Sequence, residues 1–239
     1  MSYEESIAVR ELLRLSQTDV TLDPNQGLDY AAQAYEMAKD PSVRASDPTA
    51  MAEAAAKAGF RAEQADKPLE EVSAWFERSI SSLPNSDPRS RRELVATFTL
   101  EGRALSLHSL NKVLNNQTND TPELKRFASG AFENAEDILK YQHSKGSRWD
   151  RYATMSARHR ATHEAVFGYA DLAATTAVRG MWRAIRADRE GKPSEEHRSF
   201  VKKHLIGNFV AGLLVVSRPI DRIPKVNAQR LKVAHKLLG

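Results

Sequence analysis

The chain has 239 residues, of which 41% are hydrophobic and 28% are charged, a balance typical of globular proteins with a sizeable core. It contains no cysteine, which excludes disulfides, thiolate metal sites and cysteine nucleophiles and fits a cytoplasmic location. Residues 1–11 are polar and acidic, unlike a signal peptide.

Charge is distributed unevenly along the chain. Residues 1–100 carry 11 Lys and Arg against 17 Asp and Glu, a net charge of −6, whereas residues 145–239 carry 19 against 8, a net charge of +11. We predict that residues 1–239 form a single all-helical domain. The charge count divides it into an acidic half (1–100) and a basic half (145–239). This asymmetry indicates an anionic partner for the basic half, or head-to-tail contact between copies in a homo-oligomer. A charged surface that only contacts solvent is the alternative.

The apolar residues follow helical spacing, and strand-like alternation is almost absent, so the sequence predicts an all-α fold of about nine to ten helices. A first helix covers residues 3–15. Asp23-Pro24 starts a second helix, because Asp caps a helix and Pro fits its first turn. Asp40-Pro41 ends this helix. After a short polar loop, Asp47-Pro48 begins a helical hairpin that reaches Pro84.

The hairpin has small residues on its first helix and a bulky aromatic on its second. The two sets are Ala55, Ala58, Gly59 and Ala62, followed by Val72, Phe76 and Ser79. Small residues let two helix backbones approach closely, and we expect Phe76 to fill the gap between neighbours. Such a pair cannot bury its apolar faces alone, which implies that antiparallel hairpins stack beside one another.

Further helices are predicted at residues 88–114, 122–139, 195–216 and 226–238. Residues 149–189 contain no proline, and we interpret them as two helices joined by a tight turn near Gly168. The most apolar run, residues 205–216, is shorter than the roughly 20 residues of a membrane span, so we expect no span. We interpret this run as a buried helix, with an interfacial or partner-binding helix as the alternative.

A spacing of small residue, aromatic and small residue occurs three times, at 31/35/38, 72/76/79 and 128/132/135. It resembles the second helix of tetratricopeptide (TPR) repeats over residues 25–160. The interval of 43 residues between Gly59 and Gly102 departs from the family's repeat of roughly 34 residues. A divergent TPR-like solenoid and another all-α bundle both remain open.

The resemblance implies a noncatalytic scaffold or adaptor that binds a protein or peptide partner through a helical groove. No Gly-rich phosphate loop, nucleophile elbow or paired-carboxylate motif is present, so we expect no cofactor and favour a noncatalytic protein. An enzyme stays open as an alternative, because all-α active sites often leave no linear motif.

The basic half supplies the candidate binding residues, because arginine forks bind carboxylates and phosphates while aromatic faces stack on bases. Tryptophan and tyrosine lie between these arginines in the sequence, which makes RNA binding the alternative function; tryptophans buried in a core would weaken it. The candidates for partner or polyanion binding are Arg148, Arg151, Arg158, Arg160, Arg179, Arg183, Arg186, Lys232 and Lys236.

His159 and His163 are four residues apart, a spacing at which two imidazoles on one helix face can hold zinc. A complete site needs further ligands from another helix, and the sequence nominates none. We therefore predict no metal site and interpret both histidines as structural.

Overall fold

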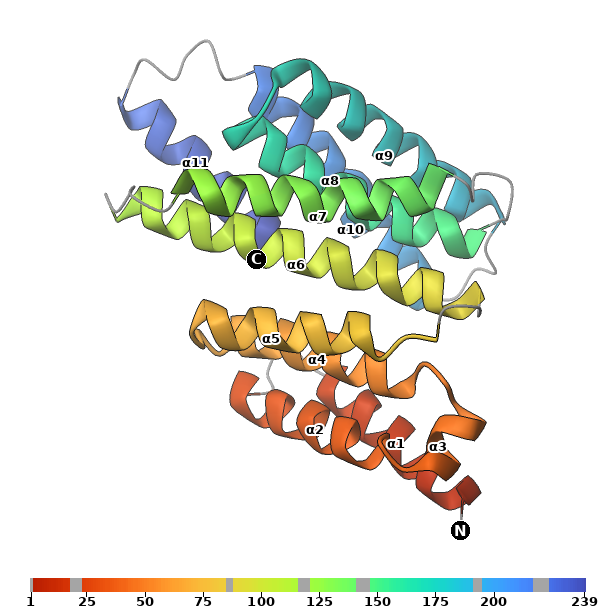
Figure 1. The fold of residues 1–239 in the computed structure, drawn as a ribbon. Coiled ribbons are helices and arrows are strands. Elements are labelled where there is room, and N and C mark those ends of the chain that lie inside the picture. The colour runs from red at the N-terminus through yellow and green to blue at the C-terminus, as the bar shows by residue number, and fades with distance from the viewer. Residues whose placement is uncertain are drawn as a thin grey trace. The chain divides into compact units, whose positions relative to one another are not determined.

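A computed structural model describes residues 2–17, 23–84, 88–115, 121–140, 147–190, 195–216 and 224–239, and these residues form eleven α-helices and no strand (Figure 1). The all-α prediction is confirmed. The predicted number of nine to ten helices was too low. Adjacent helices pack against each other in sequence, as expected of stacked hairpins.

The chain divides into two compact units, unit 1 (Met1–Glu101) and unit 2 (Gly102–Gly239), and the division falls within helix α6. Unit 1 contains α1 (Ser2–Gln17), α2 (Pro24–Met37), α3 (Pro41–Ser46), α4 (Ala50–Gln64), α5 (Leu69–Ser81) and the first half of α6 (Pro88–Leu114). Unit 2 contains the second half of α6 with α7 (Thr121–Lys140), α8 (Ser147–Phe167), α9 (Ala170–Glu190), α10 (Glu195–Val216) and α11 (Pro224–Leu238). The division lies close to the end of the acidic part of the sequence.

Asp-Pro pairs begin two of the helices in unit 1. The Asp23 carboxylate accepts a hydrogen bond from the Asn25 amide at 3.1 Å, and the Asp40 carboxylate accepts one from the Ser42 amide at 2.8 Å. Both caps satisfy an amide that has no partner within the helix. The loop predicted after Asp40 is therefore wrong, because Asp40-Pro41 starts the short helix α3 as well as following α2.

A glycine lies under a phenylalanine ring in each unit. Phe76 of α5 is buried over Gly59 of α4, where an added Cβ would lie 2.9 Å from the ring. Phe132 of α7 is buried in the same way over Gly102 of α6, with 3.0 Å between the added Cβ and the ring. The prediction that Phe76 fills the gap between neighbouring helices is confirmed.

Helix α8 is the centre of unit 2 and contacts α7, α9, α10 and α11 (Figure 1). The predicted turn near Gly168 is confirmed, because α8 ends at Phe167 and α9 begins at Ala170. A side chain at position 168 would overlap the carboxylate of Glu164, which accepts a hydrogen bond from the Tyr169 amide at 3.3 Å. Glycine at this position thus leaves room for a carboxylate that helps to close the turn.

Helix α10 buries several small residues together with Leu214, and it exposes other large apolar residues. Gly207, Asn208 and Ala211 are buried against the neighbouring helices, whereas Phe209 and Val216 are 54% and 72% exposed. The interpretation of residues 205–216 as a buried helix is corrected accordingly. By length and composition alone, the segment Arg198–Val216 is sufficient to cross a membrane, and one third of its most apolar window is buried.

Candidate functional site: an arginine pocket in unit 2

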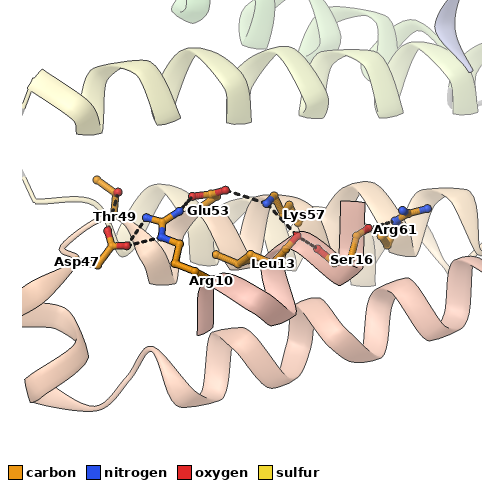
Figure 2. A network of polar contacts seen from close by, with 8 residues as sticks. All are labelled: Arg10, Leu13, Ser16, Asp47, Thr49, Glu53, Lys57 and Arg61. Atoms are coloured by element: carbon orange, nitrogen blue, oxygen red, sulfur yellow. Dashed lines mark hydrogen bonds and ion pairs between the residues drawn. The ribbon is translucent and has the colours of Figure 1, made fainter. Parts of the chain in front are cut away.

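Unit 1 contains a network of charged side chains that satisfy one another (Figure 2). Arg10 of α1 donates to Asp47 at 2.6 Å and to Glu53 of α4 at 2.5 Å. Lys57 pairs with Glu53 at 2.8 Å and donates to the Leu13 carbonyl at 3.2 Å. Because each cation here already has acceptors within unit 1, the network acts as a cross-link between α1 and α4.

Glu93 of α6 adds an unfavourable charge beside this network. Burial and the nearby Glu53 carboxylate raise the pKa of Glu93 to about 7. Between pH 4.5 and pH 7 folded unit 1 therefore holds a proton that the unfolded chain releases, so stability falls as pH rises. We expect Glu93→Gln to raise the free energy of unfolding of unit 1 by about 2 kcal/mol at pH 8, with little change below pH 5.

Urea denaturation of unit 1, followed at both pH values, measures this difference. The matched change Glu53→Gln should act in the opposite direction. Burial favours a raised pKa at Glu53, but its ion pairs with Lys57 and Arg10 outweigh burial and lower the pKa. A Glu93→Gln protein with unchanged stability at pH 8 would contradict the assignment.

Several basic residues of unit 2 bind the last carbonyl groups of helices. Arg158 of α8 is buried and donates to the Leu237 carbonyl of α11 at 2.5 Å. Arg103 of α6 donates to the Gly239 carbonyl at 3.1 Å, and Arg230 of α11 donates to the Leu214 carbonyl of α10 at 3.0 Å. The last carbonyls of a helix lack partners within it and carry partial negative charge. Arg158 therefore lies inside the fold as a cap for α11.

Three other arginines converge on one pocket between α7, α8 and α9, which we call the arginine pocket. Its charged walls are Glu136 of α7, Arg160 of α8, and Arg179 and Arg183 of α9. Smaller side chains complete it, including the hydroxyl groups of Ser156 and Thr176. The volume of about 20 Å³ suits water or one small group inserted from a larger partner.

The arginine pocket holds more positive than negative charge. Glu136 forms an ion pair with Arg160 and lies 3.7 Å from a terminal nitrogen of Arg179. The side chain of Arg160 is 9% exposed, and that of Arg179 is 61% exposed. One wall carboxylate thus serves two arginines, one of them buried and the other open to solvent.

The Nε atom of Arg160 is buried without a hydrogen-bond partner. The nearest carboxylate in an ion pair with it, that of Glu164, is 4.0 Å away, too far for a hydrogen bond. A buried N–H group without an acceptor is destabilising, and an acceptor brought by a ligand would satisfy it. Arg160, one of the residues that line the pocket, therefore carries a buried donor without a hydrogen-bond acceptor.

Arg183 and Arg186 follow each other on α9 but differ in surroundings. Arg186 is bound through two nitrogens to the buried Asp150 carboxylate, at 2.7 and 2.6 Å, and this pairing neutralises it. Burial lowers the pKa of Arg183, Asp150 opposes that shift, and Arg179 and Arg186 add to it. Arg183 is thus a partly desolvated cation in a positive environment, where an added anion is favoured.

The remaining predicted residues lie elsewhere in unit 2. Arg151 stacks on the ring of Phe200 at 4.5 Å, on the side of α8 that contacts α10. Lys232 and Lys236 are exposed on α11, a helix that packs against α8 and α10. The side chain of Arg148 lies outside the described residues. The structure thus gathers Arg160, Arg179 and Arg183 at the pocket, and Arg151, Lys232 and Lys236 do not line it.

The two histidines at helical spacing have different environments. His163 shares hydrogen bonds with Ser106 at 2.8 Å and Ser129 at 3.1 Å, which occupies both ring nitrogens. His159 is buried, and its Nδ1 has no hydrogen-bond partner. Within the described part of the chain, no group of three or more His, Asp or Glu side chains is arranged to hold a metal ion.

The sequence did not indicate the pocket residues that precede the basic half. Glu136 lies on α7, and no local pattern links it to an arginine 24 positions away. Comparison with protein-family models, curated proteins and solved structures finds no match to this chain. The candidate function therefore depends on the chemistry of the pocket.

Proposed function

We propose that this chain is a noncatalytic, TPR-like adaptor that binds an acidic segment of a partner protein through the arginine pocket. Two observations carry the proposal: Arg160, Arg179 and Arg183 converge on one pocket whose single lining carboxylate is Glu136, and the buried Arg160 Nε has no hydrogen-bond acceptor. Arginine forks bind carboxylates with two parallel hydrogen bonds, which gives both charge and shape selectivity. A pocket of this volume admits only the tip of an acidic side chain, and the surrounding helices would provide the rest of the interface.

The TPR-like part of the proposal has its own support. Consecutive helices pack in pairs, and the Gly59–Phe76 and Gly102–Phe132 contacts repeat one packing device along the chain. The absence of a match to any family model fits a divergent member or an unrelated helical stack equally. The adaptor function rests on the pocket and holds for either architecture.

Binding of a fluorescein-labelled peptide rich in Glu and Asp, measured by fluorescence anisotropy, tests the proposal. We expect saturable binding that is absent for the matching Gln and Asn peptide. The double change Arg179→Glu with Arg183→Glu should weaken binding on the order of 100-fold, because it replaces two attractions with two repulsions. Both side chains reach solvent, so we expect the variant to fold and to keep its helical circular dichroism.

Arg126→Glu on α7 is the matched control, since its side chain is 76% exposed and lies outside the pocket. We expect this variant to bind the acidic peptide nearly as well as the wild type. If the pocket variant and Arg126→Glu lost the same amount of affinity for the acidic peptide, the binding would be general charge attraction, and the proposal would be contradicted. Absence of saturable binding by the wild type would also contradict the proposal.

RNA is a second candidate ligand, favoured by one observation. Trp182 of α9 is 61% exposed, next to Arg183 in sequence, and so offers an open aromatic face for base stacking. The two functions differ in their salt dependence. RNA binding should weaken steeply and linearly on a logarithmic salt scale, and purified protein should carry nuclease-sensitive ultraviolet absorbance.

A further inference from the structure

The outer side of α9 and α10 carries a set of large apolar side chains, which we call the outer face. Their exposed fractions range from 36% to 72%. The residues are Val178, Trp182 and Ile185 on α9 and Ile206, Phe209, Leu213 and Val216 on α10. The spacings of three and four residues place each set on one side of its helix.

The two sets lie on the same side of the helix pair. Gly180 of α9 lies against Asn208 of α10, and Ala177 lies 3.8 Å from the position of a Cβ on Gly212, so the helices are antiparallel neighbours. In this register Trp182 is level with Ile206, and Val178 is level with the segment between Phe209 and Leu213. On each of the two helices, the residues that face α8 come first around the helix, and those at the α9–α10 contact come next. The exposed apolar set lies beyond that contact, on the side away from α8.

Unit 2 buries several polar side chains while it exposes apolar ones on this face. Its central helix α8 buries Arg158, His159 and Thr162, while α10 exposes several large apolar residues and buries Leu214. Small residues fill the contact between α9 and α10. Small residues between helices with large apolar residues outside are the pattern of helices that face lipid, whereas water favours the reverse.

Positive charge continues the outer face toward the start of α10. Arg198 and Lys202 precede Ile206 at intervals of four residues and are exposed, and Lys203 is exposed beside them. Among the side chains that the structure describes, the Asp171 carboxylate is exposed at the opposite end of the α9 set. The exposed Arg198 and Lys202, in a basic half of net charge +11, favour an anionic surface over a second copy of the same face.

We infer that the outer face of α9 and α10 binds the surface of an anionic lipid bilayer. The apolar side chains enter the boundary between headgroups and acyl chains, and Trp182 lies at that boundary. Arg198 and Lys202 contact anionic headgroups. This is the arrangement of amphipathic helices that lie in the membrane plane, and it leaves the buried contacts of α10 with α8 intact.

Vesicle flotation with the full chain tests the inference. We expect the protein to float with vesicles of phosphatidylcholine and phosphatidylserine and to remain largely unbound with phosphatidylcholine alone. Brominated acyl chains should quench tryptophan fluorescence, and Trp182→Phe should abolish most of this quenching. The double change Phe209→Gln with Leu213→Gln should reduce vesicle affinity on the order of tenfold or more, because it removes two inserted side chains.

Phe127→Gln is the matched control, since Phe127 of α7 is equally exposed but lies off the outer face. This control should float like the wild type. Failure to float with either vesicle would overturn the inference, and so would flotation that Phe209→Gln with Leu213→Gln leaves unchanged. Concentration-dependent dimerisation that this variant abolishes, without vesicle binding, would also overturn it and assign the face to a second copy.

Discussion

Acidification from pH 7 to pH 5 is expected to destabilise unit 2 by at least about 4 kcal/mol. Three buried histidines cause this effect. Burial lowers the pKa of His163 to about 4, with Lys125 and Arg160 adding to the shift. Burial together with Arg158 lowers the pKa of His204 to about 3 and that of His159 well below its usual value.

The direction of this change in stability depends on which state, folded or unfolded, binds more protons. Below pH 6.5 the unfolded chain binds protons at these histidines and the folded protein does not, so stability is lost as pH falls. His163 and His204 each contribute about 1.4 kcal/mol per pH unit between pH 6.5 and pH 5, and His159 acts in the same direction. Glu93 acts in the opposite direction in unit 1, which should therefore outlast unit 2 in acid.

Nuclear magnetic resonance of the imidazole groups in the folded protein measures the histidine pKa values directly. Circular dichroism at a series of pH values measures the loss of folded structure in acid. We expect three imidazole signals that do not titrate between pH 7 and the onset of unfolding. Titration of these three signals near pH 6.5 with unit 2 still folded would contradict the account.

Phe132→Ala is expected to lower the free energy of unfolding of unit 2 by about 3–5 kcal/mol, the typical loss when a fully buried phenylalanine is truncated. Phe132 is 0% exposed, and its ring covers Gly102 and lies 5.7 Å from the His163 ring, centre to centre. Phe76 is 1% exposed over Gly59, so Phe76→Ala should have an effect of the same size in unit 1. Chemical denaturation with separate probes for the two units measures both losses.

A double-mutant cycle between Gly102→Ala and Phe132→Ala separates the packing contact from helix propensity. Alone, Gly102→Ala should destabilise by about 1–3 kcal/mol, because its Cβ meets the Phe132 ring. In the Phe132→Ala protein the same change should be neutral or stabilising. Gly130→Ala is the control, since a Cβ there meets nothing within 4 Å and should stabilise α7 by up to about 1 kcal/mol. Additive effects in the cycle would contradict the proposed packing.

The helices were predictable where the local chemistry is strong. Asp23-Pro24 is a cap with a favoured first-turn residue, and Gly168 interrupts a long helical pattern, so both boundaries agree with the structure. The short helix α3 was missed because its six residues are too few to show a periodic pattern. Phe76 was predictable as a packing residue because the neighbouring helix presents a glycine at the matching position.

The sequence predicted that arginines form the candidate site, but not which arginines line it. Arg158 and Arg160 differ by two positions, yet one caps α11 from inside the fold and the other lines the arginine pocket. The direction of each side chain depends on helices that are distant in sequence. The exposed side of α10 was missed for a related reason, because hydrophobicity alone does not reveal that small residues occupy the inner contact.

The central claim is that Arg160 Nε receives an acceptor from an acidic partner. Nitrogen-15 spectra of the arginine side chains, recorded during titration with the acidic peptide, test this claim most directly. Arg160→Lys assigns the signal. We predict that the Arg160 Nε–H resonance shifts in proportion to peptide occupancy, while the Arg126 resonance stays in place. Saturation with peptide that leaves the Arg160 resonance unchanged would contradict the account.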